Sequence, residues 1–485
     1  MAEEQRRSRL YRLATWFDSR LGLSHPFLRP VPEYSVNPFY WLGALTVVAF
    51  VIQGVTGVVM MLYYLPNPTQ AYSSTQYVYN SVYFGTFLET IHLYTAYAMI
   101  MLAFMHMMRG YFVSVHKKPR ELMWVVGMGM GFVTLGFGFT GYLLPWTVIS
   151  KSATDVGVGM VQALPPPISS AISFLLVGTG GDAATLLRFY DLHVVVLPAI
   201  LLVLLTLKMY MLETHGISGP AFPGKAAEEE SKTVPLFPDV TVYLLELGAL
   251  FGAGILLISV LFPLSLPAPY SPQAAGAIAA QPDWYFLWIY QVLKISAFEG
   301  ANLPIALGLV TLVMLALVVL PFIDRSKKIL IAERPRFVAV GVVLVAEIAV
   351  LAAWGLVSPG QVIPTSEAAL VLGGTALLAT IAVLGVYRLA ASTPKVAGGA
   401  GPSALRASAL VIGVMSMGAA SIGVSIDSVS ELGLGGPIGL WLPRLLVSSV
   451  GIVAAAGLTI YLVYKLHSKE EVKRRIGFLD GRTGR

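Results

Sequence analysis

The stretch FGTFLETIHLYTAYAMIMLAFMHMMRGYFV, residues 84–113, largely decides what this chain can be. It is apolar and long enough to cross a membrane as a helix, since a spanning helix needs about 20 mostly apolar residues. Its two histidines, His92 and His106, are 14 positions apart. At about 100° per residue, these steps end about 40° short of four turns, so both side chains point to one face, about 21 Å apart along the axis. That separation suits two stacked cofactors, one near each membrane surface.

The composition also indicates an integral membrane protein. The chain has 485 residues, of which 56% are hydrophobic and only 12% are charged, whereas soluble domains contain about 25% charged residues. A cytosolic enzyme and a nucleic-acid-binding protein are therefore excluded, and the net charge of +6 is no sign of nucleic acid. The chain has no cysteine, which excludes thiolate metal sites, disulfides, iron–sulfur clusters and covalently attached c-type haem in it.

Ten stretches are apolar enough to span a membrane. They are far too long for barrel strands, and only helices or closed barrels satisfy the backbone in lipid. We therefore predict an all-α fold, a polytopic membrane bundle of about ten transmembrane helices. The predicted spans are 39–65, 84–113, 122–147, 188–212, 240–262, 303–323, 337–357, 366–389, 404–424 and 441–465.

The distribution of lysine and arginine predicts the orientation. One set of alternate loops contains 27 of the 32 basic residues, and the other set holds only Lys151, Arg188, Lys294 and Arg444. The positive-inside rule then places both termini of this multi-pass membrane protein in the cytoplasm. No cleaved signal peptide is predicted.

The spans and their connections divide the chain into six parts. The first part is predicted to form an amphipathic helix on the membrane surface, with a disordered basic tail as the alternative. The parts are 1–38 (cytoplasmic N-terminal segment), 39–215 (four-helix core), 216–390 (four further spans), 391–403 (flexible linker), 404–465 (two extra spans) and 466–485 (basic cytoplasmic tail).

A third histidine favours cofactors inside the four-helix core. His193 begins the fourth predicted span at a depth that matches His92, and imidazole is a common axial ligand of haem iron. A single buried histidine is usually structural, but two on one face and a third at matching depth favour haem ligation. A partner for His106 is expected 14 or 15 residues after His193, where the sequence has Leu207 and Lys208.

Two pairs of glycines lie in register with these histidines. Gly43 and Gly57 are 14 positions apart on the first predicted span, and Gly127 and Gly141 are 14 apart on the third. Removing a side chain at two depths lets a flat macrocycle lie against the backbone. Ordinary close packing is the alternative explanation, because glycine is frequent in membrane helices.

Several motifs, spread over about residues 30–390, match a known family in order. They are VNPFYWLGA and QGVTG on the first span, MHMMRG on the second, KKPREL in the loop after it, TGYLLPW at 140–146, RFYDLHVVVLP at 188–198, GISGP at 216–220 and PDWYFL at 282–287. With them the chain resembles cytochrome b of the quinol-oxidising cytochrome bc and bf complexes, in a fused, prokaryotic form with two additional C-terminal spans.

The resemblance implies two non-covalent haems, b-type or a variant porphyrin. His92 and His193 would bind the outer haem, and His106 would be the first ligand of the inner one. It also implies that quinol is oxidised at an outer site, with one electron passing to a Rieske iron–sulfur protein and one through the haems to an inner quinone site. Proton release outside and uptake inside would translocate protons.

The same resemblance implies an enzyme subunit and its partners. The chain would belong to a quinol:electron acceptor oxidoreductase of the cytochrome bc type, in a respiratory or related electron-transport chain. It would work as a homodimer with the Rieske protein and a further electron acceptor, such as a cytochrome c, a blue copper protein or a terminal oxidase.

Two segments are expected to form the outer quinol site. Proton release needs a base that reaches the quinol hydroxyl, and Asp283 in PDWY is the candidate, with Tyr285 as a hydrogen-bonding neighbour. The alternative is that Asp283 simply caps a short surface helix. In TGYLLPW, Pro145 and Trp146 are expected to shape the pocket, and Tyr142 is a weaker candidate for lining it.

The fourth haem ligand departs from the family pattern, because Lys208 stands where the family has histidine. A lysine amine can bind iron only when it is neutral. Its long stem, with a helix bend expected at Pro198, can absorb an offset of 15 residues instead of 14. The alternative is that Lys208 extends to the cytoplasmic surface. His215 is a poorer ligand candidate, because it lies about 10 Å further along the helix.

Three further departures have consequences. Trp41 occupies the position of the cysteine that attaches an extra haem in chloroplast-type members, so no covalent haem is predicted. Glu89 replaces an arginine that faces an outer-haem propionate, whereas Arg109 is retained as the inner propionate partner. PDWY replaces PEWY, which resembles members that use low-potential quinones such as menaquinone.

Two other functions share some of these features. A diheme, quinone-reactive membrane anchor of a dehydrogenase would share the haems but lack TGYLLPW and PDWY. A proton-coupled transporter would use the histidines and lysine as proton relays, although the sequence shows no inverted repeat with paired broken helices.

Overall fold

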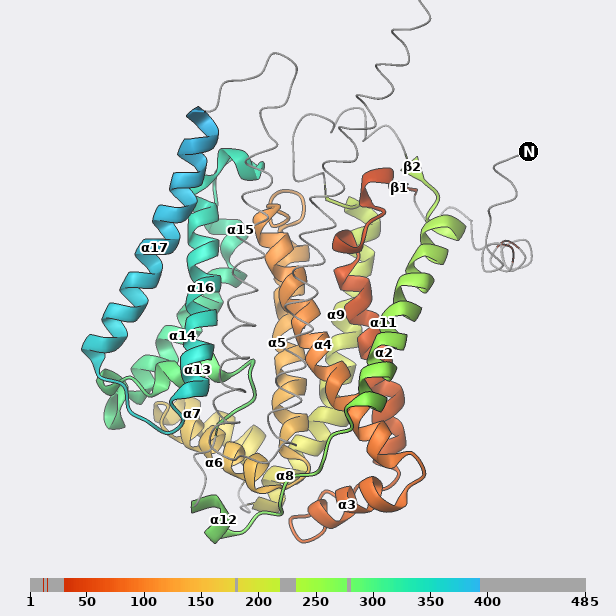
Figure 1. Ribbon diagram of the computed structural model, residues 1–485, viewed down its shortest axis with the longest axis vertical. Coiled ribbons are helices and arrows are strands. Elements are labelled where there is room, and N and C mark those ends of the chain that lie inside the picture. Colours follow the sequence, from red (N-terminus) through yellow and green to blue (C-terminus); the bar gives the residue numbers. More distant parts are fainter. Residues whose placement is uncertain are drawn as a thin grey trace, which may run out of the picture. The chain divides into compact units, whose positions relative to one another are not determined.

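The computed structural model describes residues 30–178, 182–218, 233–276 and 281–392, together with Arg12 and Thr15. Helices dominate this part of the chain (Figure 1). It divides into two compact units, Met1–Ala280 with Phe298–Ile331 and Gln281–Ala297 with Ala332–Arg485.

The first unit contains most of the helices. They are α2 (Leu42–Met61), α3 (Ala71–Ser81), α4 (Gly85–Phe112), α5 (Glu121–Leu143), α6 (Val148–Gln162), α7 (Pro166–Ile172), α8 (Asp182–Asp191), α9 (Leu197–His215), α11 (Thr241–Leu261), α12 (Pro272–Gly276), α14 (Leu303–Val318) and α15 (Leu320–Ile323). Single helical turns are η2 (Glu33–Ser35), η3 (Pro38–Tyr40), η4 (Ser173–Val177), η5 (Leu192–Val196), η6 (Leu236–Val240) and η8 (Gly300–Asn302). A short antiparallel ribbon pairs β1 (Val31–Pro32) with β2 (Thr233–Val234).

The second unit is built on α13 (Leu287–Leu293), α16 (Pro335–Val357) and α17 (Thr365–Ser392). Helix α16 packs against both of the others. The turn after α13 is joined to the segment between α16 and α17, because Ile363 N donates to Lys294 O at 2.9 Å and Ser296 N donates to Ile363 O at 2.8 Å. The 3-10 turns η7 (Ser296–Phe298) and η9 (Ile331–Glu333) mark where the chain passes between the units.

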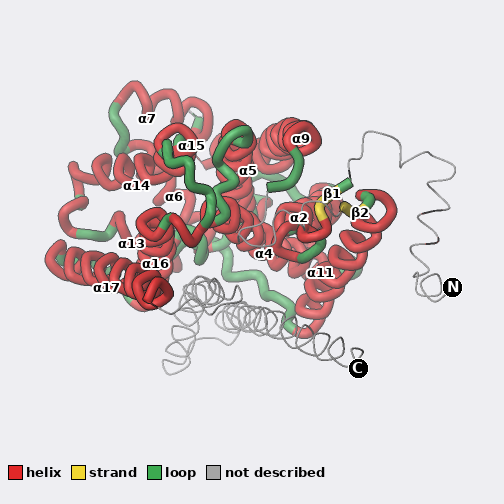
Figure 2. Tube along the Cα trace, turned by 90° about the horizontal axis from the view of Figure 1, so that it is seen from above, coloured by secondary structure: helices red, strands yellow, loops and turns green. Residues whose placement is uncertain are grey.

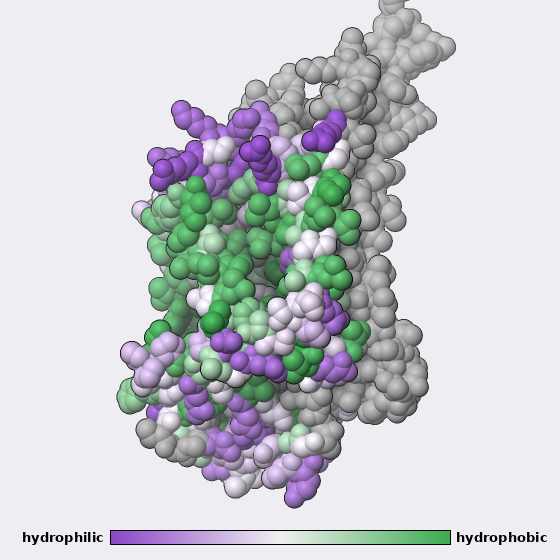
Figure 3. Space-filling view, turned by 90° about the vertical axis from the view of Figure 1, so that its left-hand side faces the viewer, coloured by the Kyte–Doolittle hydropathy of each residue, from purple (hydrophilic) through white to green (hydrophobic). Residues whose placement is uncertain are grey.

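Among the residues that the structure describes, eight helical segments are long and apolar enough to cross a membrane. They are α2, α4, α5, the continuous segment Asp182–His215, η6 with α11, η8 with α14, α16 and the first 21 residues of α17. On the face drawn in Figure 3, hydrophobic residues form a band between hydrophilic ends. The prediction of a polytopic, all-α membrane protein is therefore confirmed.

Some predictions fall outside the described residues. The two extra spans, 404–424 and 441–465, belong there, as does most of the N-terminal segment 1–38. The first two residues of the predicted linker 391–403 belong to α17, which continues to Ser392.

Four helices of the first unit, α2, α4, α5 and α9, surround a common core (Figure 2). Helix α4 packs against α2 and α5, and α5 packs against α9. Ala49, Met99 and Leu201 form a buried apolar cluster between them, with Phe137 of α5 against it. Met99 is seven positions from both His92 and His106. The apolar cluster therefore lies halfway between the two histidines along α4 and separates their two levels in the bundle.

Arg120 of the KKPREL motif links this motif directly to the end of α9 and the start of the GISGP motif. Helix α9 ends at His215, and Gly216 follows it with a left-handed φ of 67°. Arg120 of KKPREL donates to the carbonyls of His215 (3.1 Å), Gly216 (3.4 Å) and Ile217 (3.0 Å). These contacts supply hydrogen bonds and positive charge where a helix C-terminus lacks both.

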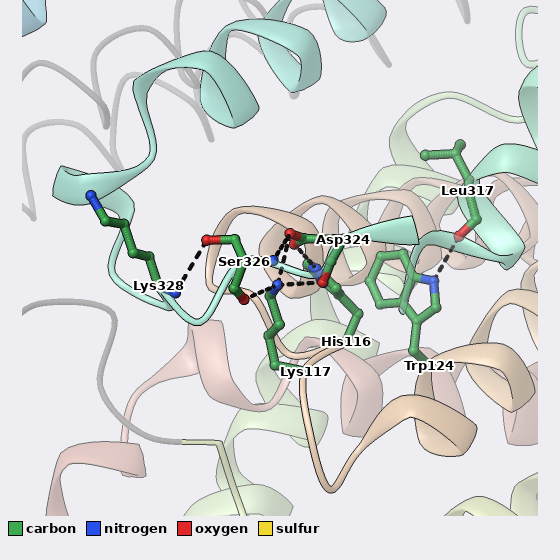
Figure 4. Close-up of polar contacts among 7 residues, drawn as sticks. All are labelled: His116, Lys117, Trp124, Leu317, Asp324, Ser326 and Lys328. Atoms are coloured by element: carbon green, nitrogen blue, oxygen red, sulfur yellow. Dashed lines mark hydrogen bonds and ion pairs between the residues drawn. The ribbon is translucent and has the colours of Figure 1, made fainter. Parts of the chain in front are cut away.

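A buried ion-pair cluster ties the loop after α4 to the end of α15 (Figure 4). His116 Nε2 lies 2.7 Å from Asp324 Oδ2, and Lys117 Nζ lies 2.7 Å from Asp324 Oδ1. Lys117 also donates to the carbonyls of Asp324 (2.7 Å) and Ser326 (2.6 Å). The side chain of His116 is fully buried.

Candidate haem and quinol sites

Two histidines face each other at one end of the bundle, which is called the outer level after its predicted orientation. His92 belongs to α4 and His193 to the turn η5. Their ring centroids are 6.3 Å apart, and the ring planes are inclined at 62°. Two metal–nitrogen bonds of about 2 Å each account for most of this separation, so the pair can bind one metal ion from two sides.

Hydrogen bonds define the tautomer of both rings. His92 Nδ1 lies 2.8 Å from Thr56 Oγ1, and His193 Nδ1 lies 3.1 Å from Thr140 Oγ1. Each threonine hydroxyl has only one proton and donates it to a backbone carbonyl, to Ile52 O at 2.7 Å and Gly136 O at 2.8 Å. The histidine Nδ1 must therefore be the donor, which leaves the lone pair on Nε2 of a neutral ring. That is the form in which imidazole binds a metal.

The turn that contains His193 also explains the spacing to Lys208. Residues Leu192–Val196 form a π turn inside the otherwise α-helical segment 182–215. A π turn contains about one residue more than an α turn. The 15 positions from His193 to Lys208 are therefore equivalent to 14 on a regular helix. The proposed bend at Pro198 is not needed for this offset.

Glycines face the candidate ligands at all four positions. A Cβ at Gly57 would lie 3.4 Å from His92 Cε1, and one at Gly141 would lie only 2.5 Å from His193 Cε1. At the inner level, a Cβ at Gly43 would lie 3.1 Å from His106 Cε1. At Gly141 the ligand side chain occupies the space of a Cβ, at Gly43 a Cβ would be tightly packed, and at Gly57 it would make an ordinary van der Waals contact.

Lys208 has the same relation to Gly127. A Cβ at Gly127 would lie 2.9 Å from Lys208 Nζ. The amine is thus directed at α5 inside the bundle, at the level of His106, and Lys208 is close enough to His106 to interact with it electrostatically. This differs from the alternative in which Lys208 extends along the helix to the membrane surface.

The inner level has one polar atom that lacks a hydrogen bond. His106 Nδ1 is buried and has no hydrogen-bond partner. Arg109, one turn further along α4, places its guanidinium 4.0 Å from the Tyr40 ring centroid and donates to Ser218 Oγ at 3.4 Å. Within the described ranges 30–178, 182–218, 233–276 and 281–392, no group of three or more His, Cys, Asp or Glu is arranged to hold a metal ion. Each level thus presents two candidate ligands from opposite sides, an arrangement that fits haem iron.

Glu89, which replaces the family's arginine, lies one turn before His92 on α4. Its charge acts on Tyr79 of α3, whose phenol pKa is raised by burial and, to a lesser extent, by this carboxylate. Glu89 therefore lies beside α3 at the outer end of α4.

The TGYLLPW segment comprises the last turn of α5 and the three residues after it, at the outer end of the first unit. Trp146 is buried and has a left-handed backbone, with φ of 53°, which is rare for a bulky residue and is typical of functional sites. It packs with Ala71 and Leu186. Tyr64 donates to Leu144 O at 2.7 Å, and burial, then Tyr190, raises the pKa of its phenol. Sequence analysis missed Tyr64.

The PDWY segment belongs to the second unit. Asp283 Oδ1 accepts from Trp284 N at 3.3 Å, and Asp283 O accepts from Phe286 N at 2.9 Å. Helix α13 begins only at Leu287, with Phe286 as its N-cap and no side-chain capping bond, so the helix-cap alternative for Asp283 is wrong. Tyr285 is buried, and its ring contacts those of Trp284 and Phe286.

The structure thus brings together three of the predicted groups: the outer histidines, the inner His106 with Lys208, and the glycines opposite them. Sequence analysis missed Thr56 and Thr140. A signal for them exists, because both outer glycines follow a threonine, in Thr56–Gly57 and Thr140–Gly141, and neither inner glycine does.

These features define a class, the polytopic helical membrane proteins whose central bundle carries paired candidate ligands for a metal. Two family models match the chain. The model described as Cytochrome b(N-terminal)/b6/petB matches residues 97–275, and that described as Cytochrome b(C-terminal)/b6/petD matches residues 276–372.

Individual relatives agree with this result. A cytochrome bc complex cytochrome b subunit of Chlorobaculum thiosulfatiphilum is 34% identical over 322 residues, which are 65% of this chain and 74% of the relative. A cytochrome b of Sulfolobus acidocaldarius is 33% identical over 386 residues, covering 73% of this chain and 67% of the relative. The fold is similar to that of a hyperthermophilic respiratory Complex III chain, with a TM-score of 0.63 at 24% identity, covering 78% of this chain and 99% of that one.

The chain belongs to the cytochrome b family, with the N- and C-terminal parts of the family fused in one polypeptide. The resemblance recognised from the sequence motifs is thereby confirmed.

Proposed function

We propose that the chain is the diheme subunit of a bc-type quinol:electron acceptor oxidoreductase. It oxidises quinol at an outer site, passes one electron to a Rieske iron–sulfur protein and the other across the membrane to an inner quinone site, and so translocates protons. The observation that supports this most is the repetition of one arrangement at two levels of a single bundle. At each level, two candidate ligands stand opposite two glycines.

When bound, haem supplies a reversible one-electron centre at each level. His92 and His193 would hold the outer iron through Nε2, while threonine hydroxyls fix the orientation of both rings. His106 and Lys208 would hold the inner iron. Arg109 supplies a fixed positive charge for the propionates of that haem.

At the outer quinol site, the residues of the two motifs have different roles. Asp283 accepts a quinol proton and releases it to the outer aqueous phase, and Tyr285 orients the quinol by hydrogen bonding. Tyr142, Pro145 and Trp146 shape the pocket and exclude water. The buried, left-handed Trp146 supports a fixed pocket wall.

The chain works in a complex embedded in a prokaryotic plasma membrane, with both termini in the cytoplasm. Its partners are the Rieske protein, a further electron acceptor and a second copy of the chain. The relative from Chlorobaculum thiosulfatiphilum, itself described as a subunit of a cytochrome bc complex, supports this assignment.

The test uses the intact complex extracted from membranes. An alkaline pyridine haemochrome spectrum should show two haems per chain, whereas protein without haem would contradict the proposal and favour a transporter. Quinol-driven haem reduction should be blocked by inhibitors of outer quinol sites. Haem reduction that is insensitive to these inhibitors would instead indicate a dehydrogenase anchor.

A further inference from the structure

A buried lysine lies directly beside Trp146. Lys151 is in the first turns of α6, and only 4% of its surface is exposed. Its Nζ lies 2.5 Å from Asp155 Oδ1 and 3.3 Å from Asp182 Oδ1. The same nitrogen is 5.7 Å from the ring centroid of Trp146 and 5.2 Å from that of Tyr270. Both distances lie within the range of a cation–π interaction, about 6 Å.

Helix stability alone does not account for a lysine at this position. A cation near a helix N-terminus opposes the helix dipole, and a lysine that precedes its acidic partner by four residues has the less favourable orientation. Burial alone would lower the pKa of the Lys151 amine, but the hydrogen bond and charge of Asp155, together with Asp182, raise it above its ordinary value. The side chain therefore stays charged, although it is buried.

Lys151 connects three segments around Trp146. Asp155 belongs to α6 itself, Asp182 begins α8, and Tyr270 belongs to the segment after α11. That segment is attached to the start of α6, because Val148 N donates to Ala268 O at 3.0 Å. The carboxyl groups are about half exposed, with 53% of the Asp155 side chain and 59% of the Asp182 side chain accessible. The ammonium group thus lies between the exposed carboxylates and the buried tryptophan.

We propose that Lys151 is a positioning residue for quinol oxidation, which holds the Trp146 ring in place by joining α6, α8 and Tyr270 around it. This inference rests on the proposed function, since it assumes that Trp146 shapes the quinol pocket. It assigns to Lys151 no contact with quinol and no part in proton or electron transfer. Its effect should therefore appear in quinol binding and not in the rate at saturation.

The test compares Lys151→Met and Lys151→Arg in the intact complex, with steady-state quinol oxidation at saturating electron acceptor. Lys151→Met should raise the KM for quinol about three- to tenfold, the range of a lost cation–π contact, and weaken an outer-site inhibitor by a similar factor. The kcat and the low-spin spectrum of the outer haem should remain close to wild type. Lys151→Arg, which keeps the charge and can stack on aromatic rings, should restore most of the affinity.

Lys117→Met is the matched control. Lys117 is also a poorly exposed lysine paired with an aspartate, Asp324, but it lies in the loop after α4, away from Trp146. It should lower the stability of the complex without changing the KM for quinol. An unchanged KM in Lys151→Met, or an equal rise in both variants, would overturn the proposal for Lys151. A wild-type complex that does not oxidise quinol would instead refute the proposed function.

Discussion

The amine of Lys208 lies where a side chain on Gly127 would stand, 2.9 Å from the position of its missing Cβ. His193 has the same relation to Gly141 on the same pair of helices. A lysine whose side chain extended to the membrane surface would not lie in this space. The equivalence of the two positions therefore supports Lys208 as the fourth ligand of the bundle.

Replacing Lys208 tests this role directly. Lys208→Ala should abolish the low-spin spectrum of the inner haem, because one axial ligand is removed, and should leave the outer haem unchanged. Lys208→His should retain a low-spin inner haem. Leu207→Ala, a change at the neighbouring position, is the control for helix disruption. An unchanged inner-haem spectrum in Lys208→Ala would exclude ligation by this residue.

The glycines opposite the outer histidines should differ in their tolerance of a methyl group. Gly141→Ala places a Cβ 2.5 Å from His193 Cε1, whereas Gly57→Ala places one at 3.4 Å from His92 Cε1. The first contact requires a shift of the ligand, and the second is an ordinary van der Waals contact. Gly141→Ala should therefore lose most of the outer haem, and Gly57→Ala should keep it.

Gly131→Ala is the control on the same helix, since no heavy atom lies within 4 Å of its Cβ position. Haem content per chain, measured by the pyridine haemochrome method, distinguishes the three variants. Equal haem loss in all three would indicate general sensitivity of α5 and α2 to substitution.

Replacing Thr140 should change the midpoint potential of the outer haem. Thr140→Val removes a hydrogen-bond partner of His193 Nδ1, with a net contribution of about 0.5–1.5 kcal/mol. Because about 59 mV corresponds to a tenfold change in a one-electron couple, the outer midpoint potential should shift by some tens of mV. Thr134→Val is the control, because Thr134 donates only to Met130 O. Redox titration should show a shift at the outer haem in Thr140→Val alone.

The parts predicted from the sequence are those that depend on local patterns. Span positions follow from apolar composition, and the positions of His92 and His106 follow from helical periodicity within one uninterrupted helix. The offset between His193 and Lys208 could not be explained in this way, because a π turn results from packing around Leu192–Val196 and has no signal in residue type. The orientation of Lys208 toward Gly127 likewise depends on contacts with another helix.

The alternative for Asp283, that it caps a short helix, is wrong for a similar reason. An aspartate shortly before a short helix is typical of an N-cap, but here a turn over Trp284 and Phe286 intervenes and the helix begins at Leu287. One or two residues in the helix start decide whether a carboxylate caps the helix.

The burial of Lys294 predicts that the stability of the protein depends on pH. Burial lowers the pKa of the Lys294 amine from 10.5 to about 8, and the amine donates to Ser358 O. Between these two values the unfolded chain binds more protons than the folded chain, so the free energy of unfolding should rise with pH. Because Lys294 is partly exposed, the change in Tm should be on the order of 1 °C. Thermal unfolding of the complex at pH 8 and pH 10 should show a smaller rise for Lys294→Met, and the same rise as wild type for the exposed Lys118→Met.

Replacing Arg120 should affect the inner level of the bundle through the end of α9. Arg120→Ala leaves the last carbonyls of α9, at His215, Gly216 and Ile217, without their donor, which costs about 1–3 kcal/mol for partly buried groups. Fraying of α9 from this end reaches Lys208 after two turns, whereas His193 lies about four turns further away. The variant should therefore lower the Tm by several degrees and broaden the inner-haem spectrum while the outer haem stays normal. Lys118→Ala, in the same loop, should do neither. If both haems changed equally, Arg120 would stabilise the bundle as a whole and not the α9 terminus.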